Sequence, residues 1–112
     1  MGDTPELSIF ELHEQITKGL FPPYSNTDER FLALALAGEV GELCNMVKKR
    51  WRDGKDLTDE IRDEIADIRV YLELMAKCFD IEGAKLNRQV ADKLRRVAER
   101  FKDRLVKEAN RG

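Results

Sequence analysis

The sequence predicts an all-α protein built from four helices. Apolar residues recur at three- and four-residue intervals in four stretches, which is the period of a helix with one buried face. The 112 residues are 42% hydrophobic and 38% charged and include only three prolines, a composition typical of a folded, helix-rich chain. A chain of this length is near the common size of one domain, so we expect residues 1–112 to form a single domain.

Two helices are predicted in the first half of the chain. The first covers about residues 4–18 and has Pro5 at its first helical position. Glycine and two prolines within residues 19–23 end it, because a proline forces the preceding residue away from helical angles. The second helix is predicted over about residues 28–52, with acidic residues in its first turn.

Two further helices are predicted in the second half. Residues 53–55 form a turn, and Asp56 or Thr58 caps a third helix that reaches about residue 79. A glycine-containing break follows, and the fourth helix covers roughly residues 84–109.

Two glycines lie inside the second predicted helix. Gly38 and Gly41 each cost roughly 1 kcal/mol relative to alanine in a helix interior. Such a cost indicates a place where another backbone or a ligand comes close.

Two acidic pairs with the same spacing lie in the second and third helices. Glu39 and Glu42 form the first pair, and Glu64 and Asp67 form the second. At roughly 100° per residue, Glu39 and Glu64 fall inside the apolar arcs of their helices, and the other two lie at the edges. Two helices that pack through these arcs would bring the four carboxylates together.

Carboxylates gathered between helices indicate a cation. Removing an ionised carboxylate from water costs several kcal/mol, and close carboxylates also repel one another. Mg²⁺ relieves both penalties, because it takes a few carboxylates together with substrate phosphates and water. The alternative is that these acids belong to ordinary solvated faces of a highly charged chain. The repetition of the pair on two apolar arcs favours the metal site.

The same residues carry a resemblance to a known superfamily. The pattern E-x-x-E followed by E-x-x-D resembles the signature of the all-α nucleoside triphosphate pyrophosphohydrolases. The segments LALAGEVGEL and DEIADIRVYL are similar to the MazG-like members, and the resemblance covers about residues 31–101. It implies a four-helix MazG-like bundle that is completed by oligomerisation, as a homodimer or homotetramer.

The resemblance also implies an activity and a set of site residues. The reaction is hydrolysis of a nucleoside or deoxynucleoside triphosphate between the α and β phosphates, giving the monophosphate and pyrophosphate. Glu39, Glu42, Glu64 and Asp67 would hold Mg²⁺, with Mn²⁺ as an alternative, and Glu39 or Glu42 would orient or deprotonate the attacking water. The substrate-binding candidates are Lys48, Lys49, Tyr71, Lys93, Arg96 and Arg100.

The charge distribution leaves two other readings open. Residues 1–84 hold 10 Lys and Arg against 18 Asp and Glu, whereas residues 85–112 hold 10 against 4. A basic last helix suits either phosphate binding or a helical interaction module that has no catalytic activity. Compensation of a helix dipole is likewise an alternative role for Lys48 and Lys49. Nucleic-acid binding by residues 85–112 is disfavoured, because four acids interrupt the basic surface and no recognised binding motif is present.

The sequence predicts a cytoplasmic protein. No apolar run approaches the roughly 18 residues that span a membrane, and the acidic N-terminus does not resemble a signal peptide. Cys44 and Cys78 lack metal-ligand spacing and are interpreted as reduced thiols.

Overall fold

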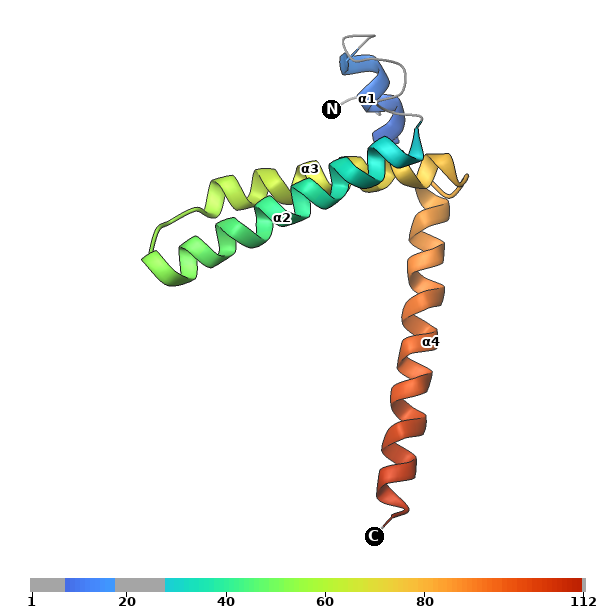
Figure 1. The fold of residues 1–112 in the computed structure, drawn as a ribbon. Coiled ribbons are helices and arrows are strands. Elements are labelled where there is room, and N and C mark those ends of the chain that lie inside the picture. The colour runs from blue at the N-terminus through green and yellow to red at the C-terminus, as the bar shows by residue number, and fades with distance from the viewer. Residues whose placement is uncertain (1–7, 18–27, 112) are drawn as a thin grey trace, which may run out of the picture. The chain divides into compact units, whose positions relative to one another are not determined.

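The described part of the chain is helical. The computed structural model describes residues 8–17 and 28–111, and these residues contain no strand. Their helices are α1 (Ile9–Thr17), α2 (Glu29–Asp53), α3 (Thr58–Cys78) and α4 (Ala84–Ala109) (Figure 1). The predicted all-α class is therefore confirmed, and α2, α3 and α4 begin and end within about one residue of their predicted bounds. Among the described residues, no helix is both long enough and apolar enough to cross a membrane.

α1 begins later than predicted because Ser8 caps it. The backbone N–H of Glu11 donates to Ser8 Oγ at 3.1 Å, and the N–H of Ser8 donates to Glu11 Oε2 at 3.4 Å. This reciprocal arrangement is a capping box, which satisfies two donors that a helix start leaves open. Thr4 and Pro5, where the helix was predicted to begin, lie outside the described residues.

Local side-chain and backbone contacts also set the ends of α2 and the start of α3. Asp28 Oδ1 accepts the N–H of Arg30 at 2.9 Å and caps α2. Gly54 ends α2 in the left-handed conformation, with φ 65°, which glycine adopts without steric cost. Before α3, Asp56 Oδ1 accepts both the N–H and the hydroxyl of Thr58, at 3.1 and 2.7 Å.

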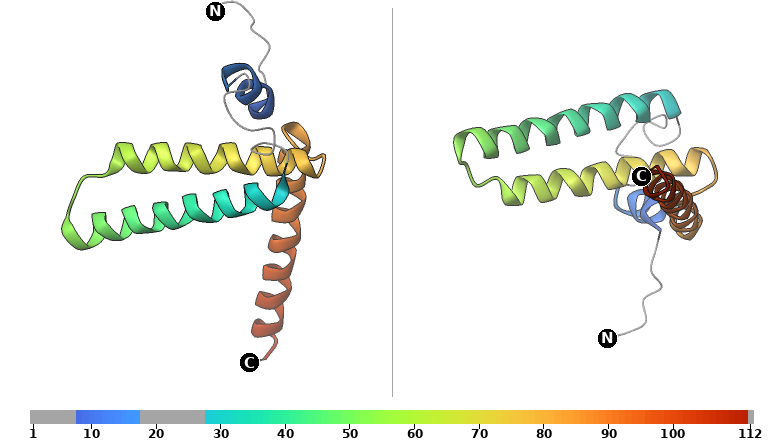
Figure 2. Two further views of the ribbon diagram at one scale, coloured as in Figure 1. Left: turned by 45° about the horizontal axis from the view of Figure 1, so that its top comes forward. Right: turned by 90° about the horizontal axis from the view of Figure 1, so that it is seen from below.

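The first of two structural units, Met1–Glu82, contains α1, α2 and α3. α2 and α3 run antiparallel side by side, joined by the turn after Gly54, and α1 packs on α3 (Figure 2). The buried apolar side chains among the described residues are Leu32, Leu74 and Ala76. The described part of this unit's core is therefore small for three helices.

The second unit, Gly83–Gly112, consists of α4. No residue of α4 is buried. Large apolar side chains recur at helical spacing along α4. Val90, Leu94, Phe101, Leu105 and Val106 are exposed, whereas Leu86 and Val97 are half-buried. An isolated helix with such a stripe gains little stability by itself, because most helical stability comes from packing an apolar face.

The glycines of α2 have open space around them. A Cβ atom added at Gly38 or Gly41 would meet no atom within 4 Å. The close approach that these glycines predict is therefore not made within the described residues of one chain.

Candidate metal centre

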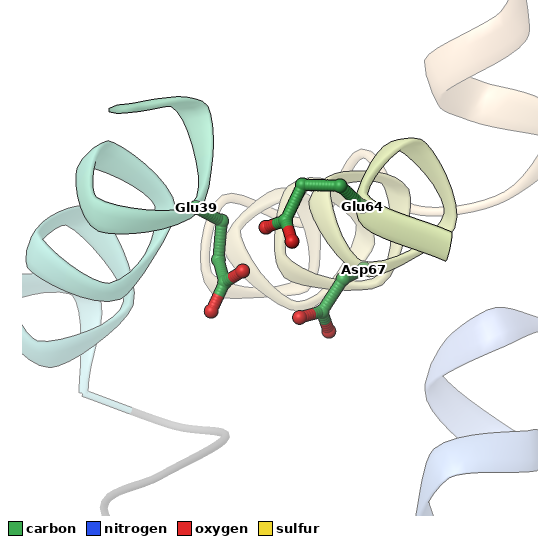
Figure 3. A group of neighbouring side chains, drawn as sticks. All are labelled: Glu39, Glu64 and Asp67. Carbon is green, nitrogen blue, oxygen red and sulfur yellow. The ribbon is translucent and has the colours of Figure 1, made fainter. Parts of the chain in front are cut away.

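Three carboxylates from two helices converge in the middle of the α2–α3 pair. Glu39 comes from α2, and Glu64 and Asp67 come from successive turns of α3. One carboxylate oxygen from each residue lies within 4.8 Å of those of the other two. Figure 3 shows the three side chains directed into one space between the helices. We refer to Glu39, Glu64 and Asp67 as the acidic triad.

The members of the acidic triad differ in their exposure. Glu64 is buried, with 8% of its surface accessible, whereas Glu39 is half-buried and Asp67 is exposed. Glu64 Oε1 is shielded from solvent and has no hydrogen-bond partner in the described part of the chain. A buried oxygen without a partner forfeits its hydration, which costs at least 1–3 kcal/mol for a polar group and more for a charged one. A cation placed between the three side chains would supply the missing partner.

The crowding raises the pKa values of two triad members. The pKa of Glu39 is raised, first because its neutral carboxyl can hydrogen-bond with Glu64, and then because burial disfavours its charged form. The pKa of Asp67 is also raised, first by partial burial and then by its interaction with Glu39. Both shifts mean that the folded chain holds protons on these groups more tightly than an isolated carboxyl does. A divalent cation bound by these groups would instead favour their ionised forms.

Tyr71 and Asp63 interact electrostatically with the acidic triad. Burial raises the pKa of the Tyr71 hydroxyl, and the charges of Asp67 and Glu39 raise it further. Tyr71 therefore lies within electrostatic reach of the acidic triad, as expected from its position one turn after Asp67. Asp63 contributes to the raised pKa of Asp67 and is a neighbour that the sequence patterns did not single out. Asp63 precedes Asp67 by four residues, and this spacing alone predicts that the two side chains are neighbours on the helix surface.

Glu42 lies outside the acidic triad. It is exposed on α2, and the group that the structure brings together contains the other three predicted ligands. Lys48 and Lys49 are also exposed. They follow Glu39 by nine and ten residues, which corresponds to about 14 Å along the helix axis. Side chains at that distance along α2 do not reach the triad from within the same helix.

The remaining predicted substrate-binding residues share one stretch of α4. Lys93, Arg96 and Arg100 line a shallow hollow on that helix together with Arg95 and Glu99. Their three- and four-residue spacing places the cations along neighbouring faces of the helix. Within its own unit, α4 thus presents a local concentration of positive charge suited to an anion.

The donor set of the acidic triad fits a hard divalent cation. All three groups are carboxylates, and oxygen ligands are those preferred by Mg²⁺ and Mn²⁺. The partnerless buried oxygen of Glu64 is a second feature that a cation would account for.

Comparisons of the chain with models of protein families, with curated proteins and with solved structures give no match.

Proposed function

We propose that this protein is a Mg²⁺-dependent nucleoside triphosphate pyrophosphohydrolase with a MazG-like fold. The observation that carries the proposal is the convergence of Glu39, Glu64 and Asp67 between two antiparallel helices, around a buried carboxylate oxygen without a partner. The reaction class, cleavage between the α and β phosphates, rests on the resemblance of the surrounding sequence to the nucleoside triphosphate pyrophosphohydrolases.

In this mechanism, the acidic triad holds Mg²⁺, with Mn²⁺ as an alternative. The ion would neutralise charge on the phosphates and acidify water. Glu39, the triad member on α2, would orient the attacking water or accept its proton. Glu42, one turn further along α2, is the second carboxylate available on the exposed side.

Tyr71, beside the acidic triad, would contact the nucleotide. The resemblance assigns the binding of the leaving pyrophosphate to Lys93, Arg96 and Arg100, which lie together on α4. We place the reaction in the cytoplasm, where nucleoside triphosphates and Mg²⁺ are abundant.

The active form in this proposal is a homodimer or homotetramer. Support comes from the small buried core of the three-helix unit and from the exposed apolar stripe of α4. Association of copies would cover apolar surface that one chain leaves in water.

The experiment that tests the proposal is an assay of pyrophosphate release. A panel of canonical and modified nucleoside triphosphates is incubated with the wild type in Mg²⁺, in Mn²⁺ and in chelator. We expect metal-dependent release of pyrophosphate and monophosphate, lost in Asp67→Asn. Release of inorganic phosphate in place of pyrophosphate would refute the assigned reaction. The absence of turnover, together with a metal site that still binds, would favour a non-catalytic helical interaction module.

A further inference from the structure

The end of α2 that lies furthest from α1 carries an exposed aromatic ring among cations. Residues 48–55 read KKRWRDGK, with five cations and one acid, and Trp51 is the only tryptophan in the chain. The turn that follows joins α2 to α3 at the left of Figure 1. We refer to residues 48–55 as the hairpin tip.

Trp51 is the most exposed of the large apolar side chains described. Its side chain is 86% accessible to solvent, so it contributes almost nothing to the core of its unit. Cations near the last turn of a helix are accounted for by the helix dipole, but the dipole does not account for an exposed indole. The exposed ring is therefore accessible to a bound group.

The cations surround the ring on the helix surface. Lys48 precedes Trp51 by three residues and lies on a neighbouring face. Arg50 and Arg52 lie about 100° to either side of it around the helix axis. A group that stacked on the indole would therefore have Lys48 and Arg50 within reach, whereas Arg52 is paired with Asp53.

The one acid of the hairpin tip is paired, because Asp53 accepts two hydrogen bonds from Arg52 at 2.8 and 3.0 Å. Asp56, the residue after the tip, accepts hydrogen bonds from Thr58. The acidic triad is also remote, because Trp51 follows Glu39 by twelve residues, or about 18 Å along the axis. That separation exceeds the roughly 8 Å Debye length at physiological salt, so the triad is screened from the tip. The five cations of the tip outnumber the acids beside them, which are Asp53 within the tip, Asp56 directly after it, and Asp59 and Glu60 in the first turn of α3.

We propose that the hairpin tip binds single-stranded nucleic acid, with one base stacked on Trp51 and the flanking phosphates held by the surrounding cations. Single strands are bound in this way, by aromatic stacking together with positive charge along the backbone. An anionic membrane is the other polyanionic surface, but membrane insertion needs several apolar side chains together. At this end of α2, Val47 is the only other exposed large apolar side chain near Trp51.

The test uses the full-length protein and a short oligothymidylate in chelator, so that neither metal nor triphosphate is present and hydrolase activity plays no part. Because Trp51 is the single tryptophan, its fluorescence reports stacking directly. We expect quenching on titration and a rise in the anisotropy of labelled oligonucleotide, with affinity that falls as salt rises.

Variants separate stacking from charge. Trp51→Leu weakens binding on the order of tenfold, whereas Trp51→Phe retains most of it, because a phenyl ring still stacks. Lys48→Gln reduces the slope of log affinity against log salt by about 0.7, the share of one phosphate contact on a single strand. Lys107→Gln, near the end of α4, is the matched control and leaves affinity unchanged. Circular dichroism verifies that each variant is folded.

Three results would overturn the proposal. The first is the absence of quenching, and the second is equal affinity for the wild type and Trp51→Leu. The third is binding to phosphatidylserine vesicles but not to the oligonucleotide, which would assign the tip to a membrane surface. Failure of the tip to bind would leave the acidic triad and its proposed reaction untouched, since those are measured by metal binding and pyrophosphate release.

Discussion

Glu39 on α2 and Glu64 on α3 place carboxylate oxygens within 4.8 Å of each other, and Glu64 Oε1 has no hydrogen-bond partner among the described residues. Two like charges at that distance oppose the packing of the helices that carry them. The stability of the metal-free chain and its response to cations should therefore both depend on these side chains.

Replacing the buried carboxylate should stabilise the metal-free protein. Glu64→Gln removes one charge from the acidic triad with little change in shape. In chelator we expect its melting temperature to exceed that of the wild type by several degrees, which corresponds to about 1 kcal/mol for a domain of this size. Mg²⁺ should raise the melting temperature of the wild type and leave that of Glu64→Gln unchanged. Glu108→Gln, an exposed change on α4, serves as the control. A lower melting temperature for Glu64→Gln in chelator would contradict this view of the site.

The stability of the metal-free protein should increase as the pH falls from neutral. The pKa values of Glu39 and Asp67 are raised above their ordinary values of 4.5 and 3.8. The unfolded chain therefore loses these protons at lower pH than the folded chain does. Above the folded-state pKa values, the two ionised groups lower the free energy of unfolding. This destabilisation disappears as the pH falls toward the ordinary values.

Urea unfolding in chelator at a series of pH values measures this effect. Glu39→Gln should flatten the dependence relative to the wild type. The pKa values of Asp28, Asp53 and Asp56 are lowered in the folded chain. The stabilisation from these three groups is therefore lost only below about their ordinary value of 3.8, and it does not mask the gain in stability expected above that value as the pH falls from neutral. Identical pH profiles for the wild type and Glu39→Gln would show that the carboxylates do not interact in the folded state.

Two glycines of the α2 region should respond oppositely to alanine. Gly54 has a φ of 65°, so Gly54→Ala should destabilise the protein by about 1 kcal/mol, because a Cβ atom is strained there. Gly38 lies within the helix with open space around it, so Gly38→Ala should stabilise an isolated chain by up to about 1 kcal/mol. Chemical denaturation measures both. Destabilisation by Gly38→Ala, with a loss of oligomer mass, would show instead that another copy packs against this face.

The apolar stripe of α4 should be needed for assembly. We expect the wild type to sediment as a dimer or tetramer and Leu94→Lys to shift it toward lower mass, because a charge would replace an apolar contact. Arg88→Gln, also exposed on α4, is the control and should keep the mass of the wild type. A wild type that is monomeric at all accessible concentrations would contradict the proposed assembly.

The helices could be predicted from the sequence because their ends depend on local chemistry. Asp28, Gly54 and the Asp56–Thr58 pair act within a few residues of themselves, and their effects are visible in the order of residues. The start of α1 differed because a capping box at Ser8 competes with the proline signal. Short-range rules therefore located α2, α3 and α4 within about a residue.

The composition of the acidic triad was only partly predictable. Periodicity directs Glu39 and Glu64 toward the facing helix, and both do converge. Whether the edge residues join them depends on how far α2 and α3 are shifted along each other, which no local pattern specifies. Asp67 joins the group, whereas Glu42 lies outside it. The exposure of Trp51 likewise depends on the long-range geometry of the helix pair.

Direct measurement of metal binding tests the central claim, that the acidic triad is a divalent cation site. Free Mn²⁺ is followed by its electron paramagnetic resonance signal during titration with the wild type, Glu64→Gln and Glu108→Gln. We predict that the wild type and Glu108→Gln bind Mn²⁺, that Mg²⁺ displaces it, and that Glu64→Gln does not bind it. Equal Mn²⁺ binding by the wild type and Glu64→Gln would contradict the assignment of the site to the acidic triad.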